Sequence, residues 1–265
     1  MKEKILLFIP MYNCEKQITR VLKQLNEEVQ EYINEIIVVN NISTDSGEEK
    51  VKEYIKDNEF KCKITLMRNC ENYGLGGSHK VAFKYAKENG FDYVIVMHGD
   101  DQSQISDLMQ ILKDGTYRKY DSMLGARFMK NSKLEGYSKF RTFGNRVYNL
   151  LFSISVRKRI YDLGSGLNMY KVESLDNEYY KKFPDNLVFN YCMIFAIDYY
   201  KQNVCFFPIT WKEEDQVSNV KMFKQATKVL KLLASYTFAH KKFMSKDHRE
   251  KRIENYESDI ICSNK

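Results

Sequence analysis

Apolar runs and helical repeats alternate through the first half of the chain. Short continuous apolar runs are typical of buried parallel strands, and they occupy residues 5–9, 35–40, 62–67, 93–97 and 122–124. Between them, apolar residues recur at helical spacing over residues 18–29, 47–56, 78–87 and 105–112. Strands separated by helices of this length predict an α/β fold with a mostly parallel sheet.

The polar turns of this half follow the predicted strands. In parallel sheets ligands bind beyond the carboxyl ends of the strands. Four turns lie at such ends, and each is rich in Asn, Asp, Gly or Tyr: residues 10–14, 40–45, 68–77 and 98–102. We therefore expect a ligand site at that edge of the sheet.

The second half is less regular. We expect a buried helix over 187–200, a strand over 204–207 and a long amphipathic helix over 222–239. Another helical repeat has an apolar stripe (Phe143, Val147, Leu150, Leu151, Ile154) and a polar opposite face (Arg146, Asn149, Ser153, Arg157). The pattern predicts a single domain over 1–240 and a polar, basic, flexible tail over 241–265 that is frayed from about Ser245.

Composition narrows the class of protein. Of 265 residues, 43% are apolar, but no run approaches the roughly 18 to 20 apolar residues that span a bilayer. The run at 5–9 is too short for a signal peptide. Six cysteines are scattered without a C-x-x-C pair, which argues against a zinc site or a disulfide framework. These features predict a cytoplasmic protein with free thiols.

Positive charge is concentrated in two segments. The net charge is +7; residues 221–252 hold ten Lys or Arg against two acids, and residues 131–160 hold seven against one. Such asymmetry predicts an anionic partner. No stacking motif or recognition helix accompanies the charge, so we expect no nucleic acid. Either these are packed helices with a solvated face, or they contact an anionic membrane surface through Arg146, Arg157, Lys158, Arg159, Lys224, Lys228 and Lys231.

The strongest chemical motif is His98-Gly99-Asp100-Asp101-Gln102, directly after the apolar run at 93–97. A carboxylate at a strand end, beside a glycine that permits close approach, suits a divalent ion that neutralises a diphosphate. An Asp-rich turn that caps the next helix is the alternative.

Several further segments resemble the family 2 glycosyltransferases, which have the GT-A fold, and most closely their dolichyl- or polyprenyl-phosphate sugar synthases. The resemblance covers roughly residues 4 to 235. The segments that carry it occur in the family's order: residues 9–13, 36–45, 72–77, 98–102, 125–128, 162–168 and 208–211.

The resemblance implies roles for particular residues. The base and ribose would be bound by the first turns, including Pro10, Tyr12, Asn40, Asn41, Asp45, Asn72 and Gly74. The family usually has Asp where this chain has Asn40, so the resemblance does not say which nucleotide base is bound.

The same resemblance implies the groups around the diphosphate. Asp100 is similar to the second acid of the family's Asp-x-Asp element, which coordinates Mn²⁺ or Mg²⁺ and the diphosphate. His98 replaces the first acid; imidazole is a ligand for Mn²⁺ but adds no negative charge. Gln102 matches a polar position of the prenyl-phosphate synthases, and Arg127 matches an arginine of theirs that contacts phosphate. Lys221 is a further candidate to stabilise the negative charge that develops on the diphosphate.

Glu214 and Asp215 belong to a carboxylate cluster after the last predicted core strand. This cluster has three interpretations: it deprotonates an acceptor hydroxyl, it orients a sugar, or it is a solvated loop. A prenyl-phosphate acceptor is already anionic and needs no general base.

Together these features predict a metal-dependent, inverting glycosyltransferase. It would move a sugar from a nucleoside diphosphate sugar to a polyprenyl phosphate or a cell-surface glycan, peripherally on the inner face of the membrane. A nucleotidyltransferase is the first alternative, although residues 10–15 lack its Gly-rich, basic phosphate loop. The second is a catalytically weak binding protein descended from a transferase.

Overall fold

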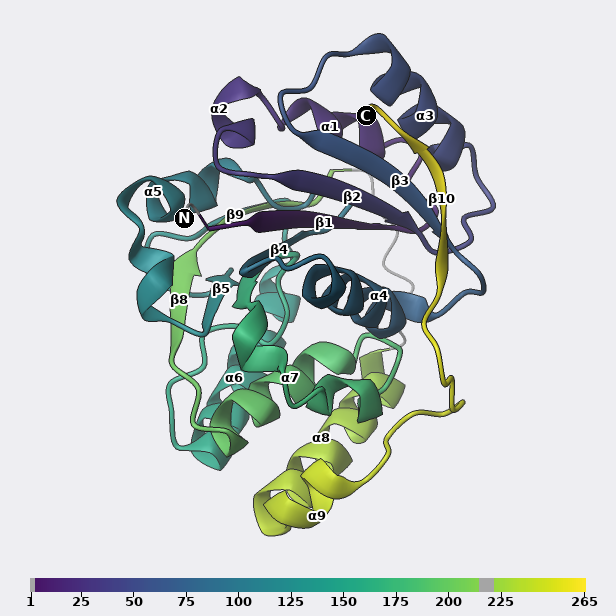
Figure 1. Ribbon diagram of the computed structural model, residues 1–265. Coiled ribbons are helices and arrows are strands. Elements are labelled where there is room, and N and C mark those ends of the chain that lie inside the picture. Colours follow the sequence, from purple (N-terminus) through teal and green to yellow (C-terminus); the bar gives the residue numbers. More distant parts are fainter. Residues whose placement is uncertain (1–2, 215–221) are drawn as a thin grey trace.

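The computed structural model describes residues 3–214 and 222–265, with the backbone alone for 222–226. An eight-stranded sheet in the order β10-β3-β2-β1-β4-β7-β5-β8 runs through it (Figure 1). Its strands are β1 (Ile5–Met11), β2 (Glu35–Asn40), β3 (Lys63–Asn69), β4 (Tyr93–Met97), β5 (Ser122–Ala126), β7 (Leu167–Lys171), β8 (Val204–Pro208) and β10 (Ser258–Ser263). A small second sheet pairs β6 (Lys133–Glu135) with β9 (Thr210–Lys212).

Most of the large sheet is parallel. β1 pairs in parallel with β2 and β4, β2 with β3, and β5 with β8. β7 runs antiparallel to both β4 and β5, so these two strands point the same way. The carboxyl ends of β1 to β5 therefore meet at one edge. The chain leaves β1 toward β2 but returns to β4 on the other side of β1, and this reversal of strand order is where ligands bind in such sheets.

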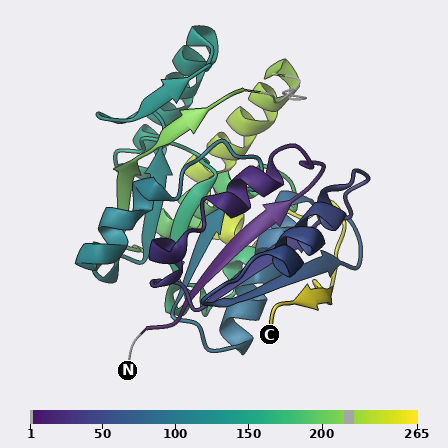
Figure 2. The ribbon, with the colours of Figure 1, turned by 90° about the horizontal axis from the view of Figure 1, so that it is seen from above.

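Helices cover both faces of the sheet (Figures 1 and 2). On one face lie α1 (Ile18–Lys23), α2 (Glu27–Gln30), α3 (Gly47–Asp57) and α5 (Ser106–Asp114). The other face carries α4 (Gly74–Glu88), α6 (Lys139–Val156), α7 (Phe189–Tyr199), α8 (Met222–Phe238) and α9 (His240–Ser245). Short 3₁₀ helices complete the chain: η1 (Thr116–Lys119), η2 (Val172–Leu175) and η3 (Tyr179–Lys182).

The continuous apolar runs are explained by this double coverage. Along β1, Leu6 and Phe8 belong to the core under α4 and α7, whereas Leu7 and Ile9 belong to the core under α1 and α3. Successive strand residues point to opposite faces, so a strand buried on both faces is apolar throughout. The α/β prediction is confirmed.

Two of the differences from the expected element boundaries have a local cause. The helix expected over 18–29 is two helices, because the Asn26 side chain accepts a hydrogen bond from Val29 N (3.0 Å) and caps a new helix there. β1 does not end at Ile9 but at Met11, since Pro10 and Met11 still pair with Val39 and Asn40 of β2.

The chain end corrects the expected frayed tail over 241–265. α9 follows α8, and β10 pairs antiparallel with β3 from Ser258 opposite Asn69 to Ser263 opposite Thr65. Without β10, the edge of β3 would present unpaired backbone groups. The polar composition of this segment concealed a short strand. Among the described residues, no helix is both long and apolar enough to cross a membrane.

Candidate functional site

A cavity of about 490 Å³ lies at the carboxyl edge of the sheet. Its walls come from the turns after β4 and β5, the residues before β7, and helices α6, α7 and α8. Four of the residues predicted from the sequence line it: His98, Asp100, Gln102 and Arg127. Of the four turns that the sequence singled out, the turn at residues 98–102 and Leu75 of the turn at 68–77 line the cavity, whereas residues 10–14 and 40–45 do not.

The turn after β4 is held tightly against its neighbours. His98 N donates to Gly166 O (2.9 Å) and Gly99 N to Pro10 O (3.0 Å). A Cβ on Gly99 would lie 2.9 Å from that Pro10 oxygen, so only glycine fits. Asp101 accepts hydrogen bonds from Arg20 Nε (2.6 Å) and from α1's C-cap Gln24 (2.9 Å). Asp101 therefore holds the turn against α1, and Asp100 is the carboxylate of this turn that lines the cavity.

His98 and Asp100 are both partly buried on the cavity wall. Burial raises the pKa of Asp100 to about 6. Burial, and to a smaller extent the Arg127 charge, lowers the pKa of His98 to about 4, so the imidazole is neutral at pH 7. Among the described atoms, His98 Nε2 has no hydrogen-bond partner.

These two side chains fit a divalent cation as a partial ligand set. A neutral imidazole nitrogen without a partner and a carboxylate that is poorly solvated are both groups that a cation would stabilise. No group of three or more His, Cys, Asp or Glu side chains suited to a metal ion occurs in the part of the chain that the structure describes. Mg²⁺ commonly takes only one or two carboxylates and completes its shell with phosphate and water. The donors present are compatible with that mode.

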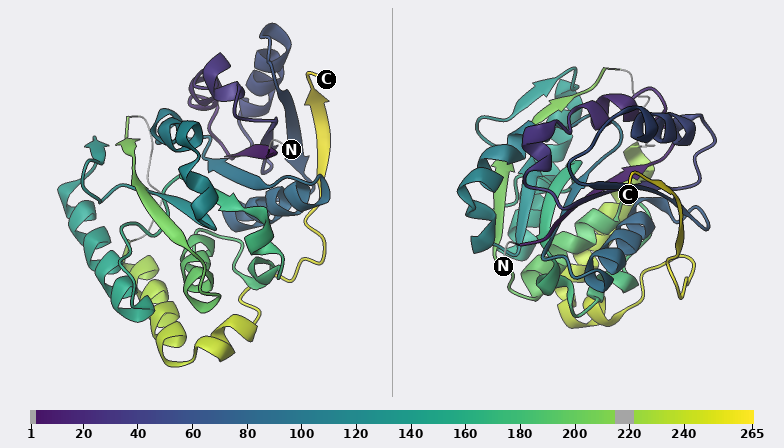
Figure 3. Two further views of the ribbon diagram at one scale, coloured as in Figure 1. Left: turned by 60° about the vertical axis from the view of Figure 1, so that its left-hand side comes forward. Right: turned by 45° about the horizontal axis from the view of Figure 1, so that its top comes forward.

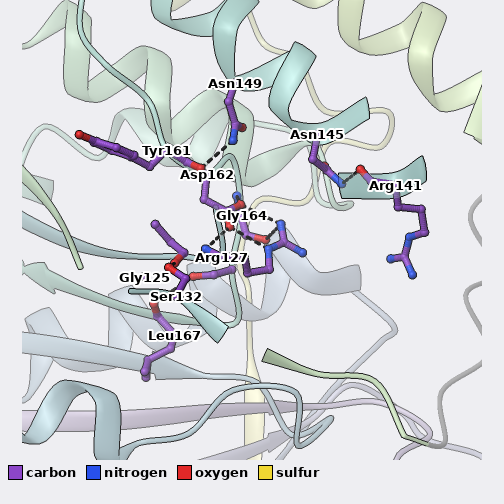
Figure 4. A network of polar contacts seen from close by, with 12 residues as sticks. Gly125, Arg127, Ser132, Arg141, Asn145, Asn149, Tyr161, Asp162, Gly164 and Leu167 are labelled. Atoms are coloured by element: carbon purple, nitrogen blue, oxygen red, sulfur yellow. Dashed lines mark hydrogen bonds and ion pairs between the residues drawn. The ribbon is translucent and has the colours of Figure 1, made fainter. Parts of the chain in front are cut away.

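Arg127 follows β5 and is fixed by Asp162 (Figure 4). Its Nε and Nη2 donate to the two oxygens of Asp162, both at 2.7 Å, and Nη2 also donates to Gly164 O (3.1 Å). Its guanidinium lies 4.7 Å from the ring of Trp211. Burial alone would lower the pKa of Arg127, but the charge and hydrogen bonds of Asp162 raise it above the ordinary value. Its Nη1 donates to no other residue among those described, so an arginine on the cavity wall retains donors for an anion.

A second ion pair lines the cavity, formed by Arg141 of α6 and Glu213. Nη1 of Arg141 donates to both carboxylate oxygens, at 2.7 and 2.8 Å. Glu213 is placed there because its N–H donates to Glu135 O (2.9 Å) and so extends the pairing of β6 and β9. Glu214 is exposed and does not line the cavity. Asp215 and Lys221, two further residues of the prediction, lie outside the described residues.

The predicted nucleotide residues after β1 and β2 do not line the cavity; Pro10 is joined to the turn that does through the hydrogen bond from Gly99 N. Asn40 Nδ2 donates to Glu48 (2.6 Å), and Asn40 Oδ1 accepts from Ser43 N (2.9 Å). The Asp45 carboxylate accepts from Gly47 N and Glu15 N. These side chains shape the turn from within, whereas Tyr12 is 52% exposed.

Asn41 and the turn after β3 are joined by side-chain amides. Asn41 Nδ2 donates to Asn72 Oδ1 (2.8 Å), which also accepts from Gly74 N (3.1 Å). Gly74 has φ +68°, and a Cβ there would lie 2.5 Å from Asp185 O. The close approach places the next residue, Leu75, in the cavity wall.

Two residues of the site were given no role from the sequence: Asp162, which holds Arg127, and Arg141, which lines the cavity. Glu213, its ion-pair partner, belongs to the predicted carboxylate cluster. Asp162 opens one of the segments that carry the family resemblance, which was its only signal. Arg141 contributed only to the charge count, and its ion pair joins residues that are 72 positions apart.

Comparison with known proteins gives both a family and a fold. The family model "Glycosyl transferase family 2" matches residues 7–178. The undecaprenyl-phosphate mannosyltransferase of Micrococcus luteus is 22% identical over 172 residues, which are 65% of this chain and 67% of that protein.

Two solved structures share the fold. A fragment of TarS from S. aureus in complex with UDP-GlcNAc has a TM-score of 0.59 at 20% identity, covering 87% of this chain and 65% of the fragment. The glucosyl-3-phosphoglycerate synthase from Mycobacterium tuberculosis, in complex with Mn²⁺, UDP and glucosyl-3-phosphoglycerate, has a TM-score of 0.59 at 10% identity. It covers 92% of this chain and 81% of the synthase. The predicted GT-A fold and the resemblance are thereby confirmed, and the chain is a glycosyltransferase that belongs to glycosyl transferase family 2.

Proposed function

We propose that this glycosyltransferase moves a sugar from a nucleoside diphosphate sugar to a polyprenyl phosphate at the inner face of a membrane. The observation that carries the proposal is the single cavity lined by His98, Asp100, Gln102 and Arg127. It combines groups for a diphosphate leaving group with an apolar and aromatic wall. The named acceptor of the M. luteus relative supports the choice of a prenyl phosphate.

In the proposed reaction, a phosphate oxygen of the acceptor attacks C1 of the donor sugar. The bond between C1 and the diphosphate oxygen breaks, and the nucleoside diphosphate leaves with the bonding electrons. Attack from the opposite side inverts the anomeric centre. Because the acceptor is already anionic, no proton has to be removed, and the Glu214 and Asp215 cluster needs no role as a base.

The main catalytic task is then to stabilise charge that develops on the leaving diphosphate. We assign this task to Arg127, whose orientation Asp162 fixes, with Gln102 and Lys221 as further contacts. His98 and Asp100 would hold Mn²⁺ or Mg²⁺, and the bound ion would neutralise the diphosphate. The Mn²⁺ in the complex of the M. tuberculosis neighbour supports this assignment.

The nucleoside is assigned to the turns at the ends of β1, β2 and β3. UDP-GlcNAc in the TarS complex supports a nucleotide-sugar donor. The residues concerned are Pro10, Tyr12, Asn40, Asn41, Asp45, Asn72 and Gly74. The exposed phenol of Tyr12 is the group best placed to cover a base.

A product analysis tests the proposal. The protein is incubated with UDP- and GDP-sugars and a short-chain polyprenyl phosphate, with Mn²⁺ or with EDTA. We expect equal amounts of glycosylated lipid phosphate and nucleoside diphosphate, only with the metal, and nearly none from Asp100→Asn. Release of pyrophosphate would instead indicate nucleotidyl transfer, and metal-independent turnover would overturn the roles of His98 and Asp100.

A further inference from the structure

Helix α6 turns its apolar side outward. Phe143, Leu150 and Ile154 are 68%, 60% and 66% exposed, and Phe140 and Val147 share their face. These five residues, here called the α6 stripe, recur every three or four positions and extend over about 21 Å of helix. Such a stripe normally faces a protein core, so its exposure calls for a partner.

The inward face of α6 explains this orientation. Asn149 is buried and donates to Tyr161 O (2.6 Å), while Ser153 Oγ accepts from Ile160 N (2.9 Å). Phe152 is fully buried and stacks on Phe195 of α7 at 5.1 Å. Two polar side chains with internal partners thus fix which side of the helix is inside, and the α6 stripe is left at the surface.

Helix α8, the neighbour of α6, is also partly apolar at its surface. The two helices lie side by side in Figure 3. Ser155 Oγ of α6 and Thr237 Oγ1 of α8 are 2.6 Å apart. On α8, Leu230 is 45% and Phe238 88% exposed. Both of these neighbouring helices therefore expose apolar side chains.

The chain segment that carries the α6 stripe is basic and contains no acidic residue. Between positions 139 and 160 the chain has no Asp or Glu. The exposed basic residues of this segment are Lys139, Arg146, Arg157, Lys158 and Arg159. None of them makes an ion pair with a carboxylate of the described residues. On α8, Lys231 is also exposed, and Lys228 lies 3.9 Å from Glu250.

The proposed acceptor site opens beside this surface. Phe140 belongs both to the α6 stripe and to the cavity wall. Gly144 and Tyr148 of α6 and Val229 of α8 line the same cavity. A lipid in contact with the α6 stripe would thus have direct access to the cavity.

We propose that the α6 stripe inserts into the interfacial layer of an anionic bilayer and so places the cavity mouth at the lipid surface. An apolar strip on a segment with unpaired cations fits such a surface, which offers apolar depth and negative head groups together. A symmetric second copy would bring the two like-charged faces together. The inference rests on the proposed lipid acceptor and adds the element that docks the enzyme on its membrane.

Vesicle binding separates insertion from simple charge attraction. Phe143→Gln, Leu150→Gln and Ile154→Gln combined keep every charge, and Gln preserves helix propensity. We expect this variant to lose at least about 100-fold in partitioning to vesicles rich in phosphatidylglycerol. Ile260→Gln, at a 62% exposed site on β10, is the matched control and should bind like the wild type. Unchanged binding of the triple variant would overturn the proposal.

Tryptophan fluorescence measures how deeply the α6 stripe inserts into the bilayer, and it does not depend on the folding of the triple variant. Phe143→Trp should be quenched by brominated lipid, whereas Ile260→Trp should not; Trp211, the single native tryptophan, is buried. Equal quenching at both sites would contradict insertion. Concentration-dependent dimers that the triple variant abolishes would assign the surface to a second copy instead.

Activity distinguishes this proposal from the function itself. The triple variant should transfer sugar normally to a water-soluble short-chain prenyl phosphate but poorly to a long-chain acceptor in vesicles. Normal transfer to both acceptors would overturn insertion alone. No transfer to either acceptor by the wild type would overturn the proposed function.

Discussion

The ion pair between Arg127 and Asp162 permits a quantitative test of the site. The two side chains are 11% and 1% exposed, and two hydrogen bonds of 2.7 Å join them. Removing one partner of such a buried pair leaves an uncompensated charge, which costs about 3–5 kcal/mol. Asp162→Asn and Arg127→Met should each lower the free energy of unfolding by about 3 kcal/mol, the lower end of that range. We expect this because Asn can still accept one hydrogen bond, and Asp162 would still accept from Arg127 N and Gly164 N.

The double variant should be much less destabilised than the sum of the singles. It removes both charges of the pair and leaves neither unpaired, so the coupling energy should be at least about 2 kcal/mol. Urea unfolding followed by circular dichroism and by Trp211 fluorescence measures it, and Trp211 reports locally because its ring lies 4.7 Å from the Arg127 guanidinium. Glu27→Gln removes the surface partner of Lys61 and should leave the midpoint nearly unchanged. Additive effects of the two single substitutions would refute the reasoning.

Three further predictions concern Asp100 and His98 in the turn after β4, and the last strand, β10. Burial raises the pKa of Asp100 from 3.8 to about 6. As pH rises, the unfolded state therefore releases this proton first, and the metal-free wild type should lose stability from about pH 4 to 6. Asp100→Asn should be more stable than the wild type by about 3 kcal/mol at pH 8, and this gain should disappear near pH 4. Equal stability at both pH values in denaturant titrations would contradict this. His98→Asp should preserve or tighten Mn²⁺ binding by calorimetry and His98→Ala should weaken it, whereas identical affinities would make His98 a bystander. Deleting residues 258–265 should lower the melting temperature and promote aggregation in light scattering, because the β3 edge becomes exposed; an unchanged, monomeric protein would show that β10 is dispensable.

The sequence predicted the features that depend on local pattern. Doubly buried strands read as apolar runs, and the rule that ligands bind beyond strand ends indicated the turn of His98 and Asp100. Arg127 was indicated only by the family resemblance, and all three residues line the cavity. The pair of Arg141 and Glu213 depends instead on the pairing of β6 with β9. Local pattern carries no information about such a long-range contact.

The orientation of α6 was equally beyond the sequence. Its periodicity shows two unlike faces, but Asn149 and Ser153 are inside because backbone groups of residues 160 and 161 are their partners. Those partners exist only in the folded chain. β10 was missed for a related reason, since its stability comes from the edge of β3 and not from its own composition.

The central claim is sugar transfer to a lipid phosphate, and acceptor choice tests it most directly. Labelled nucleoside diphosphate sugar and Mn²⁺ are supplied with vesicles that contain either a polyprenyl phosphate or the matching polyprenol, or with a soluble glycan. The account predicts labelled lipid only from the polyprenyl phosphate, because only that acceptor brings an anionic nucleophile. Transfer to polyprenol or to the glycan at an equal or higher rate would contradict it.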